Sequence, residues 1–576
     1  MTARALRRER HRAARRAAGG RGASAPPAQE SAAERPWAGA AGRADRLLPL
    51  LPALLAAAAY ANTIGNGFVN DDEHLILLNP WLESFRSLGA IFGDDAWGFA
   101  PGPPMAEFYR PLMHLVFLAL HQLAGPEAWA FHLANVLLHA ANTLLVFLLV
   151  ARWVGAGAES RRPGARRVPF VTALLFALHP VHTEAVAWIA ALPELVFTLF
   201  GLAALLLDAR PGGPTARRST AIGTLFLLAL LGKETAITLL AIAVIQHGIV
   251  RGRSRPFALE WRRLAPYLAA TAIYLVARGA ALSGVSIAAG HSWNLGPASW
   301  LLNVMALFAQ YLRYLVVPVG MAYWHPFEPV ASLATAAGAV ALLVAAAFAA
   351  AAWLAWRRSR LALLALAWIV VPLTPTFLLD RFPRTPFAER YLYLSVLGSA
   401  LLVALGFDAL ARRRALRGVA AILLLALATG YAAATVTRNR VWKDAYTLFM
   451  DSVRKAPDTP RPPVALASKL VERGRFDEAL AHHRILVAME PDNPGVHSAM
   501  AGALSIAGRS DEALKHFERA VALAPEDPFL HNLLAIEHAR RGELEDAREH
   551  LQIATRLAPD EPAYRNNLER LGPPAP

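Results

Sequence analysis

Residues 47–74 read Leu47-Leu-Pro-Leu-Leu-Pro-Ala-Leu-Leu-Ala-Ala-Ala-Ala-Tyr-Ala-Asn-Thr-Ile64 and then, after Gly-Asn-Gly, Phe68-Val-Asn-Asp-Asp-Glu-His74. The first part is an apolar block that follows two arginines and lacks a cleavage site with small residues at the right spacing. We therefore expect an uncleaved signal anchor whose amino end is cytoplasmic. The second part brings two adjacent carboxylates, Asp71 and Asp72, close to the membrane surface. The stretch indicates an integral membrane protein with candidate catalytic groups beside the bilayer.

The rest of the chain divides into an apolar and a polar part. Of its 576 residues, 55% are hydrophobic and 18% are charged, and the mean hydropathy is +0.34. This composition is too apolar for one soluble globule. Apolar blocks continue to about Thr437, and the remainder is polar, charged and helix-prone. We expect an all-α fold with a multi-span membrane domain over residues 47–437 and a polar helical domain over residues 438–576.

The amino-terminal tail, residues 1–46, holds 11 arginines against 4 acidic residues and supplies close to half of the net charge of +15. Its remaining residues are mostly Gly, Ala and Pro, which cannot build a core. We expect a disordered basic cytoplasmic tail rather than a nucleic-acid-binding domain. The chain has no cysteine, which excludes disulfides, thiolate catalysis and Cys-ligated metals.

Further apolar blocks predict membrane-spanning helices. They lie near residues 128–151, 168–188, 190–208, 219–231, 235–250, 264–282, 300–319, 331–356, 361–379, 391–411 and 416–437. Several are shorter than the roughly 20 residues that a span prefers, which leaves the count open by one or two.

Arginine in the short loops predicts the topology. Under the positive-inside rule, five arginine-containing loops should be cytoplasmic. These loops are residues 152–167, 210–218, 251–263, 357–360 and 412–417. Eleven spans satisfy this rule if residues 300–319 form a re-entrant or surface helix on the outer side. Residues 65–127, with 8 acidic residues against 2 arginines, then form an extracytoplasmic loop that carries Asp71 and Asp72.

The same topology places three further polar clusters at the outer ends of spans. They are His179-Pro-Val-His-Thr-Glu184, Lys233-Glu234 and Glu389-Arg390-Tyr391. We expect these clusters and the acidic pair, although far apart in sequence, to meet on one face of the membrane.

The polar domain repeats with a period of 34 residues, the tetratricopeptide period. The repeated positions are Gly474, Gly508 and Gly542; Ala479, Ala513 and Ala547; and Pro491, Pro525 and Pro559. One period earlier, Ala445 and Pro457 indicate half a repeat that joins the last span to three full repeats. Stacked repeats form a concave surface suited to peptides or partner helices, and a docked scaffold is the alternative.

Asp71 and Asp72 are the candidate catalytic residues. A carboxylate beside a low-dielectric surface can have a raised pKa, so either one could act as general base toward a hydroxyl that attacks a sugar. The other could orient the substrate or bind a divalent cation, and metal dependence stays open. A solvated turn or a helix N-cap is the alternative.

His179, His182 and Glu184 interrupt an apolar span, and ionisable groups at membrane depth usually face a cavity. Polar contacts with a substrate are favoured over metal binding, because Pro180 disturbs the helix that would align the ligands. Three cations are placed for a lipid phosphate, namely Lys233, Arg278 and Arg390, although each could equally snorkel or pair.

Several of these motifs resemble one family. They are Phe68-Val-Asn-Asp-Asp72 with Asn79-Pro80, His179-Pro-Val-His-Thr-Glu-Ala-Val186, Gly232-Lys-Glu-Thr235 and Ala388-Glu-Arg-Tyr-Leu-Tyr-Leu394, followed by the repeats. In this order they look like the transmembrane and tetratricopeptide-repeat O-mannosyltransferases and their bacterial relatives, over about residues 47–570. Where that family often has Gly-Arg-Asp/Glu, this chain reads Ala190-Ala-Leu-Pro-Glu194, with Glu194 kept and the arginine absent.

The resemblance implies a GT-C glycosyltransferase fold that takes a sugar from a polyprenyl-phosphate donor outside the cytoplasm. It assigns the catalytic position to Asp71 and Asp72, and Glu194, Glu234, Glu389 and Tyr391 join the candidate substrate contacts. We expect inverting transfer of a hexose, mannose being one candidate, to a hydroxyl acceptor such as Ser or Thr of exported proteins.

Two alternatives stay open. The acceptor could be a glycolipid or polysaccharide, or the chain could be a non-catalytic scaffold that recruits envelope-assembly partners through its repeats. In each case the expected location is the inner, cytoplasmic membrane, with the repeats on the extracytoplasmic (periplasmic) side.

Overall fold

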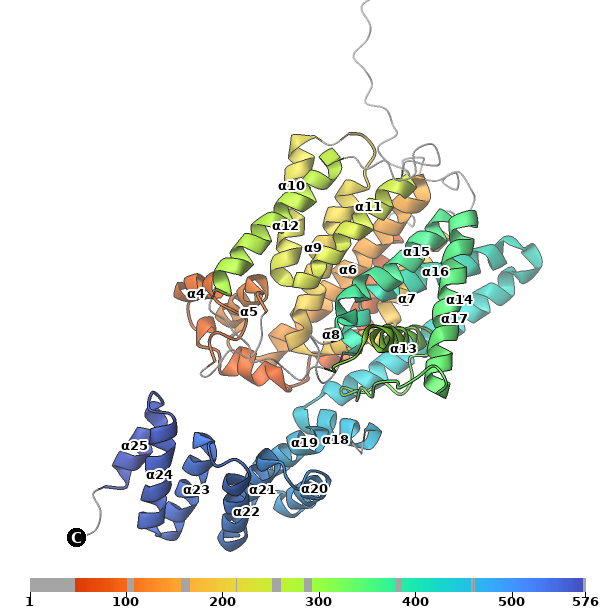
Figure 1. The fold of residues 1–576 in the computed structure, drawn as a ribbon. Coiled ribbons are helices and arrows are strands. Elements are labelled where there is room, and N and C mark those ends of the chain that lie inside the picture. The colour runs from red at the N-terminus through yellow and green to blue at the C-terminus, as the bar shows by residue number, and fades with distance from the viewer. Residues whose placement is uncertain are drawn as a thin grey trace, which may run out of the picture. The chain divides into compact units, whose positions relative to one another are not determined.

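The computed structural model describes residues 47–100, 108–156, 166–213, 215–250, 261–283, 293–379, 386–456, 459 and 461–572. Within these ranges the regular elements are helices, with no strand, which confirms the all-α prediction (Figure 1). The chain separates into two units at residues 46 and 47. The predicted tail, residues 1–46, lies outside the described residues.

A helix occupies each of the eleven predicted spans. These are α3 (Leu50–Tyr60), α6 (Ala128–Ala156), α7 (Arg167–Leu178) with the short α8 (Thr183–Ala187), α9 (Leu192–Asp208), α10 (Ala216–Gly232), α11 (Leu239–Val250), α12 (Trp261–Ala281), α14 (Ala336–Arg358), α15 (Arg360–Val370), α16 (Ser395–Arg412) and α17 (Arg417–Asn439). Seven helices of the described chain are long and apolar enough to cross a membrane, or eight if the bent pair α7 and α8 is one span. α13 (Pro297–Val316) is not among them.

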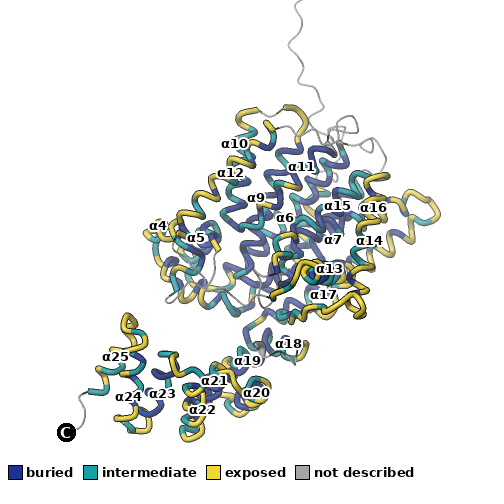
Figure 2. Tube along the Cα trace, viewed as in Figure 1, coloured by how far each residue is buried: buried dark blue, intermediate teal, exposed yellow. Residues whose placement is uncertain are grey.

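Burial differs strongly between the membrane helices. The most apolar window of α9 is 72% buried inside the protein, whereas that of α14 is 11% buried. Figure 2 shows α14 largely in the colours of exposed and intermediate residues, and α7 and α9 largely in the colour of buried residues. Since an apolar helix in a membrane can face lipid, α14 and α17 have the character of peripheral spans and α9 that of a central one.

The predicted extracytoplasmic loop, residues 65–127, contains helices in its described part. These include α4 (Leu88–Gly93) and α5 (Pro111–Ala124), which pack together, in addition to several short helical turns. α5 begins with Pro111, a residue that suits the first helical position because its missing N–H has no partner there. The extracytoplasmic location of this segment stays a prediction, and α5 fixes the position of the residue before it, Arg110.

The arginine-bearing ends of several spans lie together. Asp208, at the end of α9, contacts His247 of α11 at 2.6 Å and Arg263 of α12 at 3.8 Å. Arg218 of α10 donates to the carbonyl of Arg210 at 2.7 Å. These contacts bring the ends of α9, α11 and α12 together, and the cytoplasmic location predicted for the arginine loops stays a prediction. Residues 251–260 lie outside the described part of the chain.

The carboxy-terminal helices form stacked pairs. They are α19 (Arg461–Glu472), α20 (Phe476–Met489), α21 (Pro494–Ile506), α22 (Ser510–Leu523), α23 (Pro528–Arg541), α24 (Leu544–Leu557) and α25 (Pro562–Arg570). The turn glycines Gly474, Gly508 and Gly542 have φ values of +70°, +76° and +80°, a left-handed conformation that favours glycine. α18 (Ala445–Lys455) packs against α19 at the place of the predicted half repeat, whereas Pro457 lies outside the described residues.

Candidate functional site

The two adjacent aspartates point into different environments. Asn70, at φ +52°, turns the chain just before them. Asp72 is fully buried, and its two carboxylate oxygens accept hydrogen bonds from the backbone N–H of Val69 at 3.0 Å and of Ala190 at 2.7 Å. Burial raises the pKa of Asp72 well above its usual range. Asp71 is half-buried, accepts from the Asn70 amide at 2.8 Å and lines a cavity.

This cavity has a volume of about 170 Å³ and gathers charged side chains from distant parts of the sequence. Its charged and aromatic wall residues include Asp71, Arg110, Trp188, Glu194, Lys233, Glu234, Arg390 and Tyr391. We call Asp71, Arg110, Glu194, Lys233, Glu234, Arg390 and Tyr391 the cavity cluster. The structure thus brings the acidic pair, the Lys233-Glu234 motif and the Glu389-Arg390-Tyr391 motif to one place.

Each cation of the cavity cluster is held by a carboxylate. Lys233 pairs with Glu194 at the start of α9. Arg110 pairs with Glu234 through two bonds, from Nη2 to Oε1 at 2.6 Å and from Nε to Oε2 at 3.0 Å. Each pair fixes a long, flexible cationic side chain in the cavity wall, so the cations are preorganised.

Arg390 is held in the same way by Glu184 of α8. Its guanidinium pairs with one carboxylate oxygen of Glu184, and its backbone N–H donates to the other at 2.9 Å. Arg390 also lies 5.2 Å from the ring centroid of Trp188 and 4.9 Å from that of Tyr391. Glu184 itself is 1% exposed, so it holds Arg390 from the interior of the protein.

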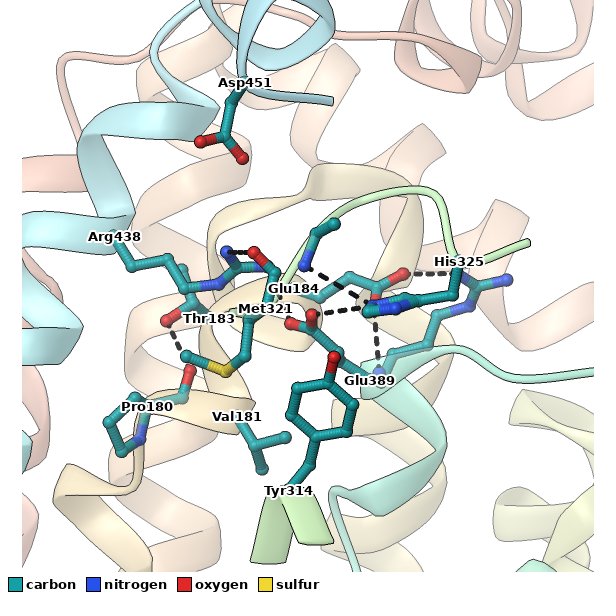
Figure 3. Close-up of polar contacts among 12 residues, drawn as sticks. Pro180, Val181, Thr183, Glu184, Tyr314, Met321, His325, Glu389, Arg438 and Asp451 are labelled. Atoms are coloured by element: carbon teal, nitrogen blue, oxygen red, sulfur yellow. Dashed lines mark hydrogen bonds and ion pairs between the residues drawn. The ribbon is translucent and has the colours of Figure 1, made fainter. Parts of the chain in front are cut away.

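A second set of polar groups lies buried next to the cavity cluster. Glu389 is fully buried and contacts Arg438 at 2.7 Å and His325 at 3.1 Å, and Figure 3 shows these two on either side of it. Arg438 also donates to the Met321 carbonyl at 2.7 Å. These contacts hold the residue directly before Arg390, so they position the cavity wall.

The two histidines predicted as substrate contacts do not line the cavity. His179 follows α7, its Nε2 contacts the Leu315 carbonyl at 3.2 Å, and its Nδ1 accepts from Val181 N–H. The Nε2 of His182 contacts the Tyr393 carbonyl at 3.2 Å. Both are buried, so in this structure they support the break between α7 and α8, and substrate contact by them stays an untested prediction. We call Asp72, His179, His182, His325, Glu389 and Arg438 the support network.

The residues that line the cavity differ in two further ways from the site residues predicted from the sequence. Arg278, in the last turn of α12, is not among the residues that line the cavity. Arg110 and Trp188, which sequence reasoning did not single out, do line it. The available signal for Arg110 was its position as one of only two arginines in the acidic stretch 65–127.

The repeats contact the stretch that carries the acidic pair. Gly67 N–H donates to the Lys443 carbonyl at 2.8 Å, and Lys469 of α19 pairs with Glu73 at 2.9 Å. Trp442, just before α18, stacks on Trp188 with ring centroids 5.9 Å apart. The first repeat helices are therefore in direct contact with the segments that form the cavity.

A metal site was left open by the sequence. Within the described residues, a group of three side chains with ligand atoms close enough to hold a metal is His538, Glu543 and Asp546. This group lies in α23, in α24 and at the turn between them in the repeats, not in the cavity.

Comparison with known proteins covers both parts of the chain. The family model for the tetratricopeptide repeat matches residues 470–537 and 504–571. Protein O-mannosyl-transferase Tmtc3 of Drosophila melanogaster is 28% identical over 508 residues, covering 75% of this chain and 54% of the relative. Protein O-mannosyl-transferase TMTC3 of Mus musculus is 27% identical, covering 74% of this chain and 49% of the relative. The chain thus spans about half the length of these relatives.

Among solved structures, the archaeal oligosaccharyltransferase AglB from Archaeoglobus fulgidus matches 71% of this chain and 56% of its own, with 15% identity and a TM-score of 0.34. The apolar helices and the relatives identify a multi-pass membrane protein. The chain is a homologue of the protein O-mannosyl-transferases, the family that its motifs resemble.

Proposed function

We propose that this protein transfers a hexose, mannose in the first instance, from a polyprenyl-monophosphate donor to a hydroxyl acceptor. The observation that carries this proposal is the cavity cluster, in which Asp71 and three cations line one cavity. A base beside cations suits a reaction in which a hydroxyl loses a proton and a phosphate leaves. The names of the relatives support the choice of mannose and of a protein acceptor.

The proposed step is a single displacement. The acceptor oxygen attacks the anomeric carbon, Asp71 takes the hydroxyl proton, and the bond from that carbon to the phosphate oxygen breaks. The electron pair leaves with the polyprenyl phosphate, whose new negative charge the cavity cations stabilise. Because one displacement reverses the configuration, the product has the inverted linkage.

Asp71 is the better candidate for the base. Asp71 is one of the residues that line the cavity, whereas both oxygens of Asp72 already accept backbone hydrogen bonds in a fully buried position. If Asp72 took a proton from the substrate, those bonds and the path of the chain would have to change. We therefore assign Asp72 the role of holding Asp71 in place.

The proposed acceptors are Ser and Thr hydroxyls of exported polypeptides, with the reaction on the extracytoplasmic face. Support comes from the repeats, since stacked helical repeats present surfaces that bind extended peptides, and α19 contacts the acidic stretch through Lys469 and Glu73. A reporter fused after Pro576 should appear outside the cytoplasm. A cytoplasmic signal would contradict this orientation.

The activity test uses the purified full-length protein with polyprenyl-phosphate mannose, polyprenyl-phosphate glucose, and Ser/Thr peptides or glycolipid as acceptors. We expect mannose transfer to peptide by the wild type, loss of transfer in Asp71→Asn, and normal transfer in Glu83→Gln, an exposed acidic control from the same stretch. Absence of transfer from every donor, or unchanged transfer in Asp71→Asn, would contradict the proposal.

A further inference from the structure

The stretch Ala190-Ala-Leu-Pro-Glu194 contributes a carboxylate to the cavity but no cation. A different element supplies a guanidinium to the same cavity. Arg110 is the N-cap residue of α5, and Pro111 at the first helical position fixes where α5 starts. The Arg110 side chain is 17% exposed and lies 4.1 Å from the Phe108 ring centroid, so it is packed but still open to the cavity.

The contacts of Arg110 leave part of its guanidinium available. A guanidinium carries five N–H donors in one plane, and the two bonds to Glu234 use one on Nε and one on Nη2. Three donors remain, on Nη1 and Nη2. Two neighbouring donors in one plane match the oxygens of a phosphate, which is why arginine binds phosphate with two parallel hydrogen bonds.

The carboxylate partners distinguish Arg110 from the other two cations. Glu234 has a side chain that is 30% exposed, whereas those of Glu194 and Glu184 are 5% and 1% exposed. If Lys233 or Arg390 turned fully toward a ligand, a deeply buried carboxylate would lose its partner, which is costly. Glu234 can be solvated instead, so Arg110 can shift toward an anion at the smallest cost.

We propose that Arg110 binds the phosphate group of a lipid-linked donor in this cavity. The inference rests on the proposed function, because it names the residue that receives the phosphate of that donor. The phosphodiester carries one negative charge before transfer, and the leaving polyprenyl phosphate carries more. Arg110 therefore both anchors the donor and stabilises the leaving group.

The test is a binding experiment on the full-length protein in detergent, with farnesyl phosphate, farnesyl phosphomannose and farnesol as probes. Arg110→Gln should bind the two phosphate-containing probes about tenfold or more weakly, since hydrogen bonds to a charged partner are lost. Its affinity for farnesol should not change. The matched control is Arg86→Gln, which alters the other, exposed arginine of the same stretch and should bind like the wild type.

The two proposals fail in different ways. Equal affinity of wild type and Arg110→Gln for farnesyl phosphate overturns the inference, whether or not the protein transfers sugar. Affinity that depends on Arg110, in a protein that transfers no sugar from any donor, upholds the anion site and rejects the proposed function.

A second variant covers the case in which Arg110→Gln does not fold. Glu234→Gln removes the carboxylate that competes for Arg110, so binding of farnesyl phosphate should become tighter while binding of farnesol stays the same. Unchanged or weaker phosphate binding in Glu234→Gln overturns the inference.

Discussion

The cavity cluster and the support network contain the same kinds of side chain, but the first lines the cavity and the second is buried behind it. In the cavity cluster, Lys233 and Arg110 pair with side-chain carboxylates in a cavity wall. In the support network, Asp72, His179 and His182 are buried against backbone groups, and Glu389 pairs with Arg438 and His325 in a fully buried position. A side-chain pair can be remade around a ligand, whereas a backbone contact fixes the path of the chain.

Neighbouring residues fall on opposite sides of this division. Asp71 lines the cavity and Asp72 holds the backbone of Ala190. Likewise Arg390 lines the cavity, while Glu389 is buried between Arg438 and His325. Each of these two motifs therefore contributes one residue to the cavity wall and one to the buried scaffold.

The largest expected effect is on the rate of sugar transfer and comes from changing Asp71. Asp71→Asn should lower sugar transfer about 10²- to 10⁴-fold, the range that a positioned general base contributes, and leave the unfolding temperature unchanged. Initial rates with saturating donor and acceptor, together with thermal unfolding in detergent, measure both. A variant that loses stability along with activity would place Asp71 in the support network instead.

The next effect is one of stability in the support network. Arg438→Met leaves Glu389 charged, fully buried and without its closest cation, which should cost about 3–5 kcal/mol of folding free energy. Thermal unfolding should show a large decrease. The double variant Arg438→Met, Glu389→Gln should recover part of it, because the buried charge is then gone. If the single and double variants unfold alike, the pair does not carry the stability assigned to it.

Asp72→Asn should have a smaller effect on stability. An asparagine has one acceptor oxygen, so one of the two backbone N–H groups, of Val69 or Ala190, is left without a partner. We expect a loss of about 1–3 kcal/mol, with any loss of transfer following from a displaced Asp71. Hydrogen exchange at Val69 and Ala190 is the direct measurement, and unchanged protection at both would show that Asp72 does not hold this backbone.

The fold was predictable because its signals are periodic. Apolar blocks and a repeat of 34 residues need no knowledge of tertiary contacts, and the structure has helices in each block. The division between Asp71 and Asp72 was not predictable in this way, since it depends on the left-handed turn at Asn70. Identical neighbouring residues carry no sequence signal that tells which one faces a cavity.

The candidate site was partly predictable for a related reason. Glu194, Lys233 and Arg390 stand at the ends of apolar spans, where a charge is conspicuous, and all three line the cavity. Arg110 precedes an apolar segment of 14 residues that is too short to be predicted as a span, so its place became visible only once α5 was folded. His179 looked functional because it interrupts a span, but the break in the helix gives it backbone partners.

The smallest expected effect applies the same distinction to the repeats. His483 lies where the next two repeats have Phe517 and Leu551, all three are buried, and the His483 Nδ1 has no hydrogen-bond partner. Burial lowers the pKa of His483 to about 4. The pKa of His483 in the folded state then lies below its unfolded value of about 6.5. Protonation of His483 therefore does not weaken the fold above that pH, and it lowers the free energy of unfolding progressively as the pH falls toward 4.

His483→Leu should therefore stabilise the repeats, by about 1–2 kcal/mol at neutral pH, and by more at pH 5 because the acid-dependent loss is removed. Thermal unfolding of the full-length protein at pH 7 and pH 5 measures both effects. Arg484→Leu, an exposed change on the same helix, is the matched control and should alter neither value by more than a few tenths of a kcal/mol. On this view His483 lowers the stability of the fold, because its buried Nδ1 has no partner. Asp72 raises the stability, because both of its carboxylate oxygens have backbone partners. Equal pH dependence in wild type and His483→Leu would show that His483 is solvated in the folded repeats and does not lower their stability.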